Sequence, residues 1–384
     1  MNRFGFTFSE EQQLIWETAR SFARERLAPT AAERDRSRQY PIELMVELGQ
    51  MGMLAMRVPQ SLGGAGIDAT GYALALEGLS EGDSPFGAMV ASSNLVASIL
   101  FEYGSAEQHE RWLRPYAEGK LGPGGYGLTE PEAGSDVAGM RTTARPVDGA
   151  YELNGSKMWI TNGSEARIFL VFAKTDPADR RRGVSCFVVE RGTPGFQVGK
   201  DEPKMGLRCS GTTALHFEDC RVDASHRLGE QGQGMAIALG ALTPGRVGIA
   251  AQCVGIAEAA YREGLAYAAE REVFGKRLTE FQNTQFLLAD ARIDVDLAWL
   301  AVLRAAALLD AGQAARMECS MAKLFASEAC NRVVDRMLQL HGGYGFSEEY
   351  PIERLYRDCR VTRIYEGTSE VQRLVISREI LRSL

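Results

Sequence analysis

Apolar and polar positions divide the chain into stretches of different character. Up to about residue 118, apolar residues recur with the spacing of helices, and glycine-rich breaks interrupt them at 63–66 and 81–85. Ser9 and Gln12 predict a capping box in front of the first helix. We therefore expect helices throughout this first stretch.

From about residue 122 to residue 228, short runs rich in β-forming residues alternate with turns. These runs are 151–153, 168–173, 184–189 and 214–217. Asn154-Gly155 is a tight-turn signal between two of them. The pattern predicts a small β-barrel or a two-sheet unit.

Helical periodicity returns after the glycine-rich segment 229–234 and continues to the end of the chain. Ile293, Leu297 and Leu300 repeat at spacings of four and three, and 317–340 is similarly amphipathic. The sequence thus predicts a mainly α protein with a middle β-domain. The expected division is an N-terminal helical domain (1–118), a middle β-domain (119–228) and a C-terminal helical bundle (229–384).

Length and composition narrow the functional classes. A chain of 384 residues is too long for one core, so two or three domains are expected. The formal net charge of −7 argues against a general nucleic-acid binder. Seven scattered cysteines without CxxC spacing indicate reduced thiols, and the four histidines show no metal-ligand spacing. We expect no metal site.

The apolar segments also bear on location. The first 27 residues are rich in glutamate and lack the apolar core of a signal peptide. No stretch approaches roughly 20 uninterrupted apolar residues, so no membrane span is expected. The expected location is the cytoplasm.

The segment 363–373, RIYEGTSEVQR, carries the strongest candidate for chemistry. Glu366 lies between Tyr365 and Gly367, before a predicted helix. A carboxylate beside a flexible backbone position can approach a substrate closely, as a base must to remove a proton from carbon. The segment alone fits a simpler interpretation equally: residues 368–370 cap the final helix, and Glu366 is solvated.

Two segments in the β region offer groups that suit a flat ligand. In 126–136, Thr129 and Ser135 carry hydroxyls near a glycine that permits close backbone approach. In 157–163, strand alternation places Trp159 and Thr161 on one face, which suits a flat heterocycle. An ordinary polar loop and a core tryptophan are the alternatives.

Two further segments lie in the second helical stretch. In 271–282, an arginine close to a glycine break is a candidate phosphate clamp. In 339–346, several glycines permit a ligand to approach the backbone. A solvated arginine and a plain glycine turn explain these segments as well.

Together, in their order and spacing, these segments resemble an acyl-CoA dehydrogenase over essentially the whole chain. The matching segments are YGLTEPEAGSD (126–136), KMWITNG (157–163), KMGLRCSGT (204–212), REVFGKRLTEFQ (271–282), QLHGGYGF (339–346) and RIYEGTSEVQRL (363–374). So many matches in the right order favour Glu366 as a catalytic residue.

The resemblance implies a fold and a cofactor. The family has an N-terminal helical domain, a β-barrel-like middle domain and a C-terminal four-helix bundle, with FAD between the last two. Its homotetramers share FAD sites across a dimer interface. The resemblance implies that the isoalloxazine contacts are Tyr126, Leu128, Thr129, Ser135, Trp159 and Thr161. It also implies that the rest of FAD is held, partly by the neighbouring subunit, at Arg271, Phe274, Gln282, Gln339, Gly342, Gly343, Thr368 and Glu370.

The same resemblance implies the reaction. The substrate would be an acyl-CoA, oxidised to the trans-2-enoyl-CoA, with contacts from Ser135, Thr243, Arg246 and Gly367. Glu366 would remove the α proton while the β hydrogen leaves as hydride to flavin N5. Burial against the ligand would raise the pKa of Glu366 and strengthen it as a base. An electron-transfer flavoprotein is the expected electron acceptor.

Two positions depart from the patterns of relatives. Some relatives place the base just before the arginine that Arg246 matches, and Gly245 stands there in this chain. Many relatives carry an acidic residue where this chain has Thr243, and Pro244 follows it. That departure keeps open a dehydrogenase of carrier-protein-bound acyl chains, or an enoyl-thioester reductase. A non-catalytic flavin- or CoA-binding scaffold would require Glu366 to be idle.

The acyl chain length is not predicted. The segment 88–101 is expected to form the pocket floor, and its polar residues Ser92, Ser93 and Asn94 would indicate a short or branched acyl group if they face the pocket.

Overall fold

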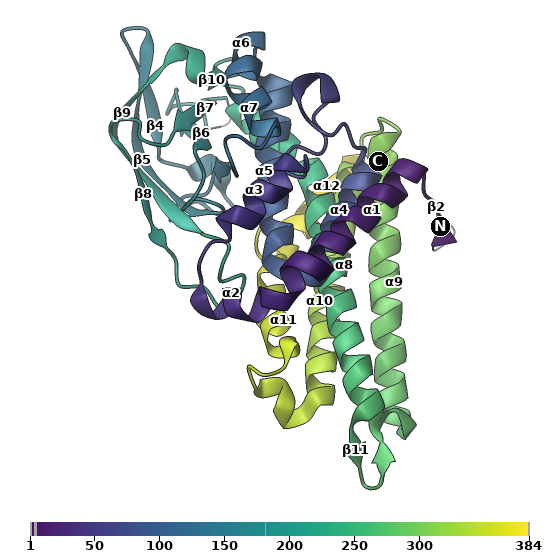
Figure 1. Ribbon diagram of the computed structural model, residues 1–384. Coiled ribbons are helices and arrows are strands. Elements are labelled where there is room, and N and C mark those ends of the chain that lie inside the picture. The colour runs from purple at the N-terminus through teal and green to yellow at the C-terminus, as the bar shows by residue number, and fades with distance from the viewer. Residues whose placement is uncertain (1, 4–5, 181, 383–384) are drawn as a thin grey trace.

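The computed structural model describes residues 2–3, 6–180 and 182–382, and helices dominate both ends of this part of the chain (Figure 1). The helices before the sheet are α1 (Glu10–Phe22), α2 (Ala31–Ser37), α3 (Ile42–Gln50), α4 (Ala69–Gly82), α5 (Ser84–Tyr103), α6 (Ala106–Gln108) and α7 (Arg114–Ala117). Those after it are α8 (Gly234–Glu270), α9 (Gln282–Asp310), α10 (Arg316–His341), α11 (Pro351–Cys359) and α12 (Ser369–Arg382). The expected Ser9–Gln12 capping box is present at α1.

Shorter helical turns connect these elements. They are η1 (Ala23–Leu27), η2 (Ala28–Thr30), η3 (Gln60–Leu62), η4 (His109–Leu113), η5 (Val137–Gly139), η6 (Ala224–His226), η7 (Leu278–Glu280), η8 (Gly342–Phe346) and η9 (Arg360–Arg363). Two antiparallel strands of two residues each, β1 (Asn2–Arg3) and β2 (Phe6–Thr7), precede α1.

Eight strands in the middle of the chain form one sheet. They are β3 (Gly125–Gly127), β4 (Thr143–Val147), β5 (Ala150–Ile160), β6 (Ile168–Lys174), β7 (Val184–Glu190), β8 (Phe196–Asp201), β9 (Thr213–Asp223) and β10 (Arg227–Leu228). The order is β10-β7-β6-β4-β5-β9-β8, and β3 pairs in parallel with β6. The mainly α fold with a middle sheet is confirmed, whereas the domain boundaries at 118 and 228 stay predictions.

Strand β6 shows why the sheet is buried on both faces. Phe169 and Val171 point into a core formed within the sheet region, while Leu170 and Phe172 join the core shared with the helices. Because side chains alternate along a strand, two covered faces require a continuous apolar run. Figure 1 shows the helical core beside the sheet.

The tight turn expected at Asn154-Gly155 is wrong. Strand β5 runs through both residues, and its register against β9 shifts between Leu153 and Gly155. Gly155 has φ +139°, and a Cβ there would lie 2.7 Å from the Thr142 Cα. The glycine thus serves a bulge and a close backbone approach instead of a hairpin turn.

Helix α8 is the centre of the helical core and packs against α4, α5, α9 and α10. Two described helices, α5 and α8, are long and apolar enough to cross a membrane by length and composition. However, 83% and 61% of their most apolar windows are buried inside the protein. Core helices are buried to this extent, so the length and apolar composition of α5 and α8 are weak evidence that either helix crosses a membrane.

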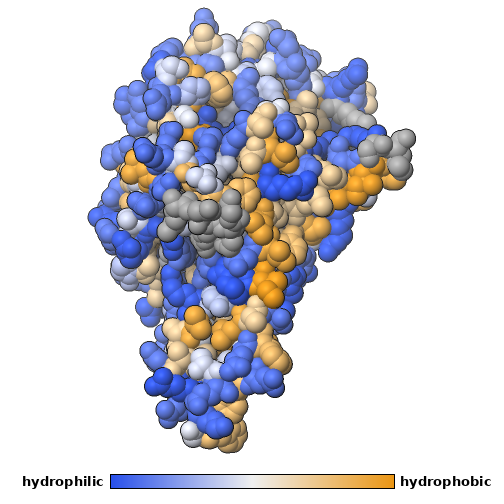
Figure 2. All heavy atoms as spheres, turned by 90° about the vertical axis from the view of Figure 1, so that its right-hand side faces the viewer, coloured by the Kyte–Doolittle hydropathy of each residue, from blue (hydrophilic) through white to orange (hydrophobic). Residues whose placement is uncertain are grey.

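The outer face of α9 does not follow the usual burial of an amphipathic helix. Phe286, Ile293 and Leu297 are exposed, although the spacing of the last two predicts an apolar helix face. The face that includes α9 carries patches of apolar atoms among polar ones (Figure 2). The residues lie on a helix, as their spacing predicts, but these side chains point away from the core of the chain.

Candidate functional site

Glu366 lies in a tight loop between η9 and α12. Both Glu366 and Gly367 have positive φ, at +54° and +91°. This conformation is unfavourable for most residues, so surrounding contacts must hold it. The capping interpretation is half right: the Thr368 hydroxyl accepts a hydrogen bond from the Val371 N–H at 3.3 Å, as a helix cap does.

The carboxyl group of Glu366, however, is not solvated. As a residue Glu366 is half-buried, but its Oε2 atom is shut off from solvent and has no hydrogen-bond partner among the described residues. Burial raises its pKa from 4.5 to about 6, against the opposing charges of Arg246 and Lys323. A buried carboxylate with a pKa close to neutrality has the properties of a general base.

Tyrosines from several elements face this carboxylate. Burial raises the pKa values of Tyr126 on β3 and Tyr72 on α4, and the charge of Glu366 raises them further. The pKa of Tyr365 is likewise raised by burial, then by Cys253 and Glu366. All three phenols therefore stay neutral at neutral pH. Their positions join the sheet, the first helical region and the final loop in one site.

Helix α8 supplies the opposite wall. A Cβ built at Gly245 would lie 3.5 Å from Glu366 Oε2 and 3.9 Å from Leu95 Cδ1 of α5. The position that is a base in some relatives thus lies directly at Glu366, but here carries no side chain. Arg246 is buried, donates to the Ser320 hydroxyl at 3.1 Å, and has an Nε atom without a partner among the described residues.

The flavin-side residues come from two adjacent segments. The Met158 N–H donates to the Thr129 carbonyl at 2.9 Å, which places Trp159 close to the segment after β3. Trp159 has φ +64° and is 57% exposed. A large aromatic side chain held outward at such a φ is unusual in a chain without a ligand at that place.

The alternation argument for Trp159 and Thr161 is wrong. The register of β5 shifts between Lys157 and Ile160, and the strand ends at Ile160. Thr161 therefore lies in the following turn and not on a regular strand. Both residues remain in the same short segment, but a bulge and not period-two geometry sets their directions.

These observations fit the FAD that the sequence resemblance implies. The exposed Trp159 ring offers a flat apolar surface. The enclosed Oε2 of Glu366 has no partner among the described residues, and its charge acts on Tyr126 of the same sheet. Leu128 is buried, and Thr129 is half-buried beside it. The isoalloxazine would therefore lie along the 126–129 and 158–161 segments.

A second group of predicted residues gathers at the far end of the bundle. Between β11 (Glu272–Val273) and β12 (Lys276–Arg277), Phe274 is 97% exposed with φ +51°. The Arg271 guanidinium lies 5.4 Å from the centre of the Tyr344 ring. Gln282, Gln339, Gly342 and Gly343 are all exposed near these elements. The β11 hairpin lies at the lower tip in Figure 1, away from α12, so one chain does not bring this group to Glu366.

Comparison with known families decides the assignment. The family models described as the N-terminal, middle and C-terminal domains of acyl-CoA dehydrogenase match residues 9–120, 125–220 and 232–381. The chain belongs to the acyl-CoA dehydrogenase family.

Individual relatives agree over full length. The chain is 43% identical to the mitochondrial short-chain specific acyl-CoA dehydrogenase of Rattus norvegicus, covering 97% of this chain and 91% of that protein. Butyryl-CoA dehydrogenase from Megasphaera elsdenii matches with a TM-score of 0.96 at 41% identity, covering 98% and 100% of the two chains. A structure described as the electron transferring flavoprotein of Acidaminococcus fermentans contains a chain that matches at 0.96 and 42%, covering 98% and 99%.

Within this acyl-CoA dehydrogenase, the remaining predicted residues are exposed or half-buried. Ser135 is exposed in the loop after β3. Glu370 is exposed in the first turn of α12, where backbone and Thr368 hydrogen bonds lower its pKa. Gly367 and Thr243 are half-buried, and α8 continues through Pro244 without a break.

The expectation for the pocket floor is only partly met. Ser93 donates to the Met89 carbonyl, and the Asn94 amide bonds to Met53, Met56 and Val90. These polar groups are used inside the protein and do not indicate an acyl length. On α5, Leu95 lies across from Gly245, the position next to Glu366 on α8.

Sequence reasoning missed two buried residues that hold the Glu366 loop. Lys323 on α10 donates to the Gly367 carbonyl, and Gln372 on α12 donates to both the Glu366 and Gly367 carbonyls. A signal existed for Lys323. It stands among Cys319, Ala322 and Ala326 on an apolar helix stripe, where a lysine is unusual.

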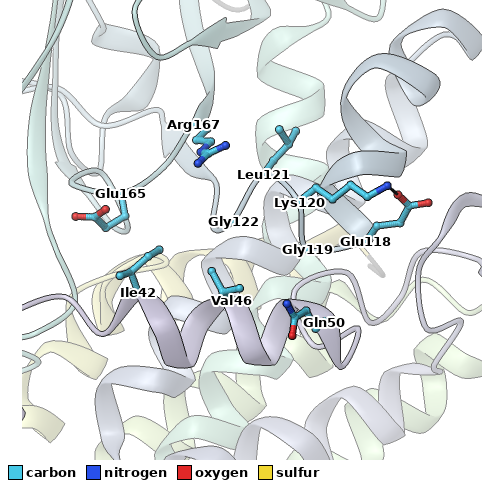
Figure 3. A pocket seen from close by; sticks show the side chains of 10 residues that line it. All are labelled: Ile42, Val46, Gln50, Glu118, Gly119, Lys120, Leu121, Gly122, Glu165 and Arg167. Carbon is cyan, nitrogen blue, oxygen red and sulfur yellow. Dashed lines mark ion pairs between the residues drawn. The ribbon is translucent and has the colours of Figure 1, made fainter.

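A separate cleft of about 360 Å³ lies between α3, the loop 118–122 and Arg167 (Figure 3). Lys120 and Glu118 form an ion pair at its rim. None of the predicted site residues is among those that line it. The cleft is therefore not part of the site around Glu366.

Proposed function

We propose that this protein catalyses the FAD-dependent α,β-dehydrogenation of a short acyl-CoA to the trans-2-enoyl-CoA. The observation that carries the proposal is the Glu366 carboxyl, enclosed, unpartnered and beside the segments that fit the flavin. Relatives named for short-chain acyl-CoA and butyryl-CoA support a short acyl group.

In this proposal Glu366 takes the α proton of the substrate. Bound FAD, held by the segments 126–129 and 158–161, would supply the two-electron acceptor for the β hydrogen. Because Oε2 has no partner among the described residues, no hydrogen bond to the protein must break before it accepts a proton. The raised pKa strengthens the base, and the neutral tyrosines around it add no competing negative charge.

The chain's residues also suggest how a short acyl group is held. Gly245 and Leu95 flank the base, so the acyl chain would pass between α8 and α5. Gly367 would lie beside the thioester, while Thr243 and Arg246 would line the path toward CoA. Trp159, Thr129 and Thr161 would hold the flavin ring.

The proposal extends to partners and location. The exposed apolar face of α9 and the exposed Phe274 hairpin support a homotetramer in which a neighbouring subunit completes each FAD site. An electron-transfer flavoprotein is the proposed electron acceptor, supported by the matching chain in the Acidaminococcus structure. The proposed location is the cytoplasm.

An anaerobic titration tests the proposal. The purified protein should be yellow, and the flavin absorbance should bleach on addition of butyryl-CoA, less readily with palmitoyl-CoA. Bleaching by an acyl-carrier-protein thioester but not by any acyl-CoA would favour the carrier-bound alternative. No bleaching by any acyl thioester, from short to long, would leave only a non-catalytic scaffold.

A further inference from the structure

Lys323 is a buried cation placed directly behind the base loop. It lies on α10, is fully buried, and its Nζ atom donates to the Gly367 carbonyl at 2.8 Å. None of the ion pairs in the described part of the chain includes it. A buried ammonium group normally needs a carboxylate partner, because desolvating a lone charge is costly.

The groups around Lys323 leave Glu366 as its main counter-charge. The titratable and charged groups that face Lys323 are Cys253, Glu366, Arg246 and Glu328. Those that face Glu366 are Arg246, Lys323, Tyr72, Tyr126 and Tyr365.

Two of these neighbours do not balance the lysine charge. Burial raises the pKa of the Cys253 thiol to about 12, so it is uncharged at neutral pH. Glu328 is already engaged, with Arg363 at 2.9 Å and the Ser369 hydroxyl at 2.7 Å. The Glu366 carboxylate is the facing anion that keeps an oxygen free of hydrogen bonds.

The lysine also acts on the backbone of the loop. Glu366 and Gly367 both have positive φ, and their carbonyls accept from Gln372 Nε2 at 3.1 Å and 2.9 Å. Lys323 adds a third, charge-assisted hydrogen bond to the same loop. We call these donors of Lys323 and Gln372 the carbonyl clamp. The clamp holds an unfavourable backbone conformation that sets where the carboxyl group lies.

We propose that Lys323 is a positioning residue for Glu366: it fixes the Gly367 carbonyl and adds to Arg246 a second positive charge that keeps the base ionised at neutral pH. This inference rests on the proposed function. It adds a residue that touches neither substrate nor flavin and acts through the loop that carries the base.

The physical consequence is a defined change in pH dependence. Burial alone disfavours the ionised form of Glu366, and the charges of Arg246 and Lys323 oppose that effect. Removing the charge raises the pKa of Glu366, so the enzyme needs a higher pH to ionise its base. Burial lowers the pKa of Lys323 itself to about 8, so the ammonium form is present where Glu366 titrates.

The test compares Lys323→Met, Lys323→Arg and Cys253→Ala in the FAD-loaded protein. Methionine keeps the length but removes charge and donor, whereas arginine keeps both. Cys253→Ala is the matched control, because it alters a neutral group that faces the same lysine. The first measurement is the pH dependence of flavin reduction by butyryl-CoA. We expect the acidic limb of the rate–pH profile to move up by about one pH unit in Lys323→Met. At pH values below the midpoint of that limb, the rate of flavin reduction should then be about tenfold lower.

The second measurement needs no turnover. The melting temperature of each chain is compared with that of its Glu366→Gln version across pH 4 to 8, and the difference reports the ionisation of Glu366. The midpoint should move upward in Lys323→Met, and stay near that of the unmodified protein in Lys323→Arg and Cys253→Ala. Midpoints that agree within about 0.3 pH unit for Lys323→Met and the unmodified chain would overturn the proposal, as would an equal move in Cys253→Ala.

The two measurements separate this inference from the proposed function. If no acyl thioester bleaches the unmodified protein, the proposed function fails, and the melting series still decides whether Lys323 sets the ionisation of Glu366. If the unmodified protein bleaches and Glu366→Gln does not, an unchanged limb in Lys323→Met overturns only the role of Lys323.

Discussion

On the sheet side of the site, Lys157 forms an ion pair with Glu130 at 2.7 Å. On the bundle side, Lys323 donates to a backbone carbonyl, and Glu366 Oε2 has no hydrogen-bond partner in the part of the chain that the structure describes. Both lysines are fully buried, and burial lowers the pKa of each to about 8. The difference lies in how much of each carboxylate is already hydrogen-bonded.

Both carboxylate oxygens of Glu130 accept hydrogen bonds, so we call this carboxylate saturated. Besides Lys157, it accepts the N–H groups of Arg141 at 2.5 Å and Thr142 at 3.0 Å. Burial alone would raise its pKa, but Lys157 and these hydrogen bonds outweigh burial and lower it. The pKa of Glu366 moves the other way because its own oxygen lacks donors. A buried carboxylate with all its partners holds structure, and one that lacks them can take up a proton.

The largest expected effect is a loss of stability when the ion pair between Glu130 and Lys157 is broken. Glu130→Gln leaves the Lys157 charge buried without its anion, so we expect a loss of about 3 to 5 kcal/mol in the free energy of unfolding. Urea denaturation at pH 7 measures it. The double variant Glu130→Gln/Lys157→Met should recover much of this loss. A Glu130→Gln protein within about 1 kcal/mol of the unmodified chain would contradict the distinction between the two regions.

Glu366→Gln tests the role of the Glu366 carboxyl group through the rate of flavin reduction. It should retain FAD and substrate binding but lose at least about 10²-fold in flavin reduction, as for the loss of a general base. Stopped-flow absorbance with butyryl-CoA measures the step. Gln372→Leu is a useful comparison, because it loosens the carbonyl clamp and keeps the base. Equal rates in Glu366→Gln and the unmodified protein would remove Glu366 from the mechanism.

The same substitution should have the opposite effect on stability. Because the folded protein raises the pKa of Glu366 from 4.5 to about 6, the folded state prefers the protonated form. Stability from this group is present below about pH 4.5 and is lost as pH rises to about 6, a change of about 2 kcal/mol. Glu366→Gln should therefore gain stability relative to the unmodified chain over this pH range. Calorimetry at pH 4.5 and 7 measures the difference in stability between Glu366→Gln and the unmodified chain. A difference that does not change with pH would contradict this prediction.

The smallest effect is expected at Gly245. Alanine there adds a methyl group at ordinary contact distance from Glu366 Oε2, inside a helix, so stability should change by less than about 1 kcal/mol. The methyl group excludes water from the carboxyl, and the acidic limb of the rate profile should move slightly upward. Gly240→Ala, on the same helix near the Tyr103 hydroxyl, serves as the control for helix propensity. A downward move of the limb would contradict the desolvation argument.

Local motifs were enough to propose the base and the flavin segments, because the residue types that suggest this chemistry lie within a few neighbouring positions. Glu366 was identifiable beside Tyr365 and Gly367, and the mainly helical fold with a middle sheet followed from periodicity. The direction of Trp159 was not predictable, because a bulge in β5 depends on pairing with β9.

Long-range packing explains the other failures. Nothing near Lys323 in sequence reveals that its Nζ atom meets Gly367, 44 residues away. The exposure of Ile293 and Leu297 also lies outside what spacing can tell, because a period of 3.6 identifies a face but not what covers it.

The carbonyl clamp separates two tasks within the proposed site. In the proposed reaction, proton transfer depends on a loop held from α10 and α12, while Leu95 of α5 and Gly245 of α8 would face the acyl group. Under this proposal, substitutions on α5 would change which acyl chain fits, while the clamp still holds the loop that carries Glu366. Substrate preference is free to diverge in this scaffold while the chemistry stays the same.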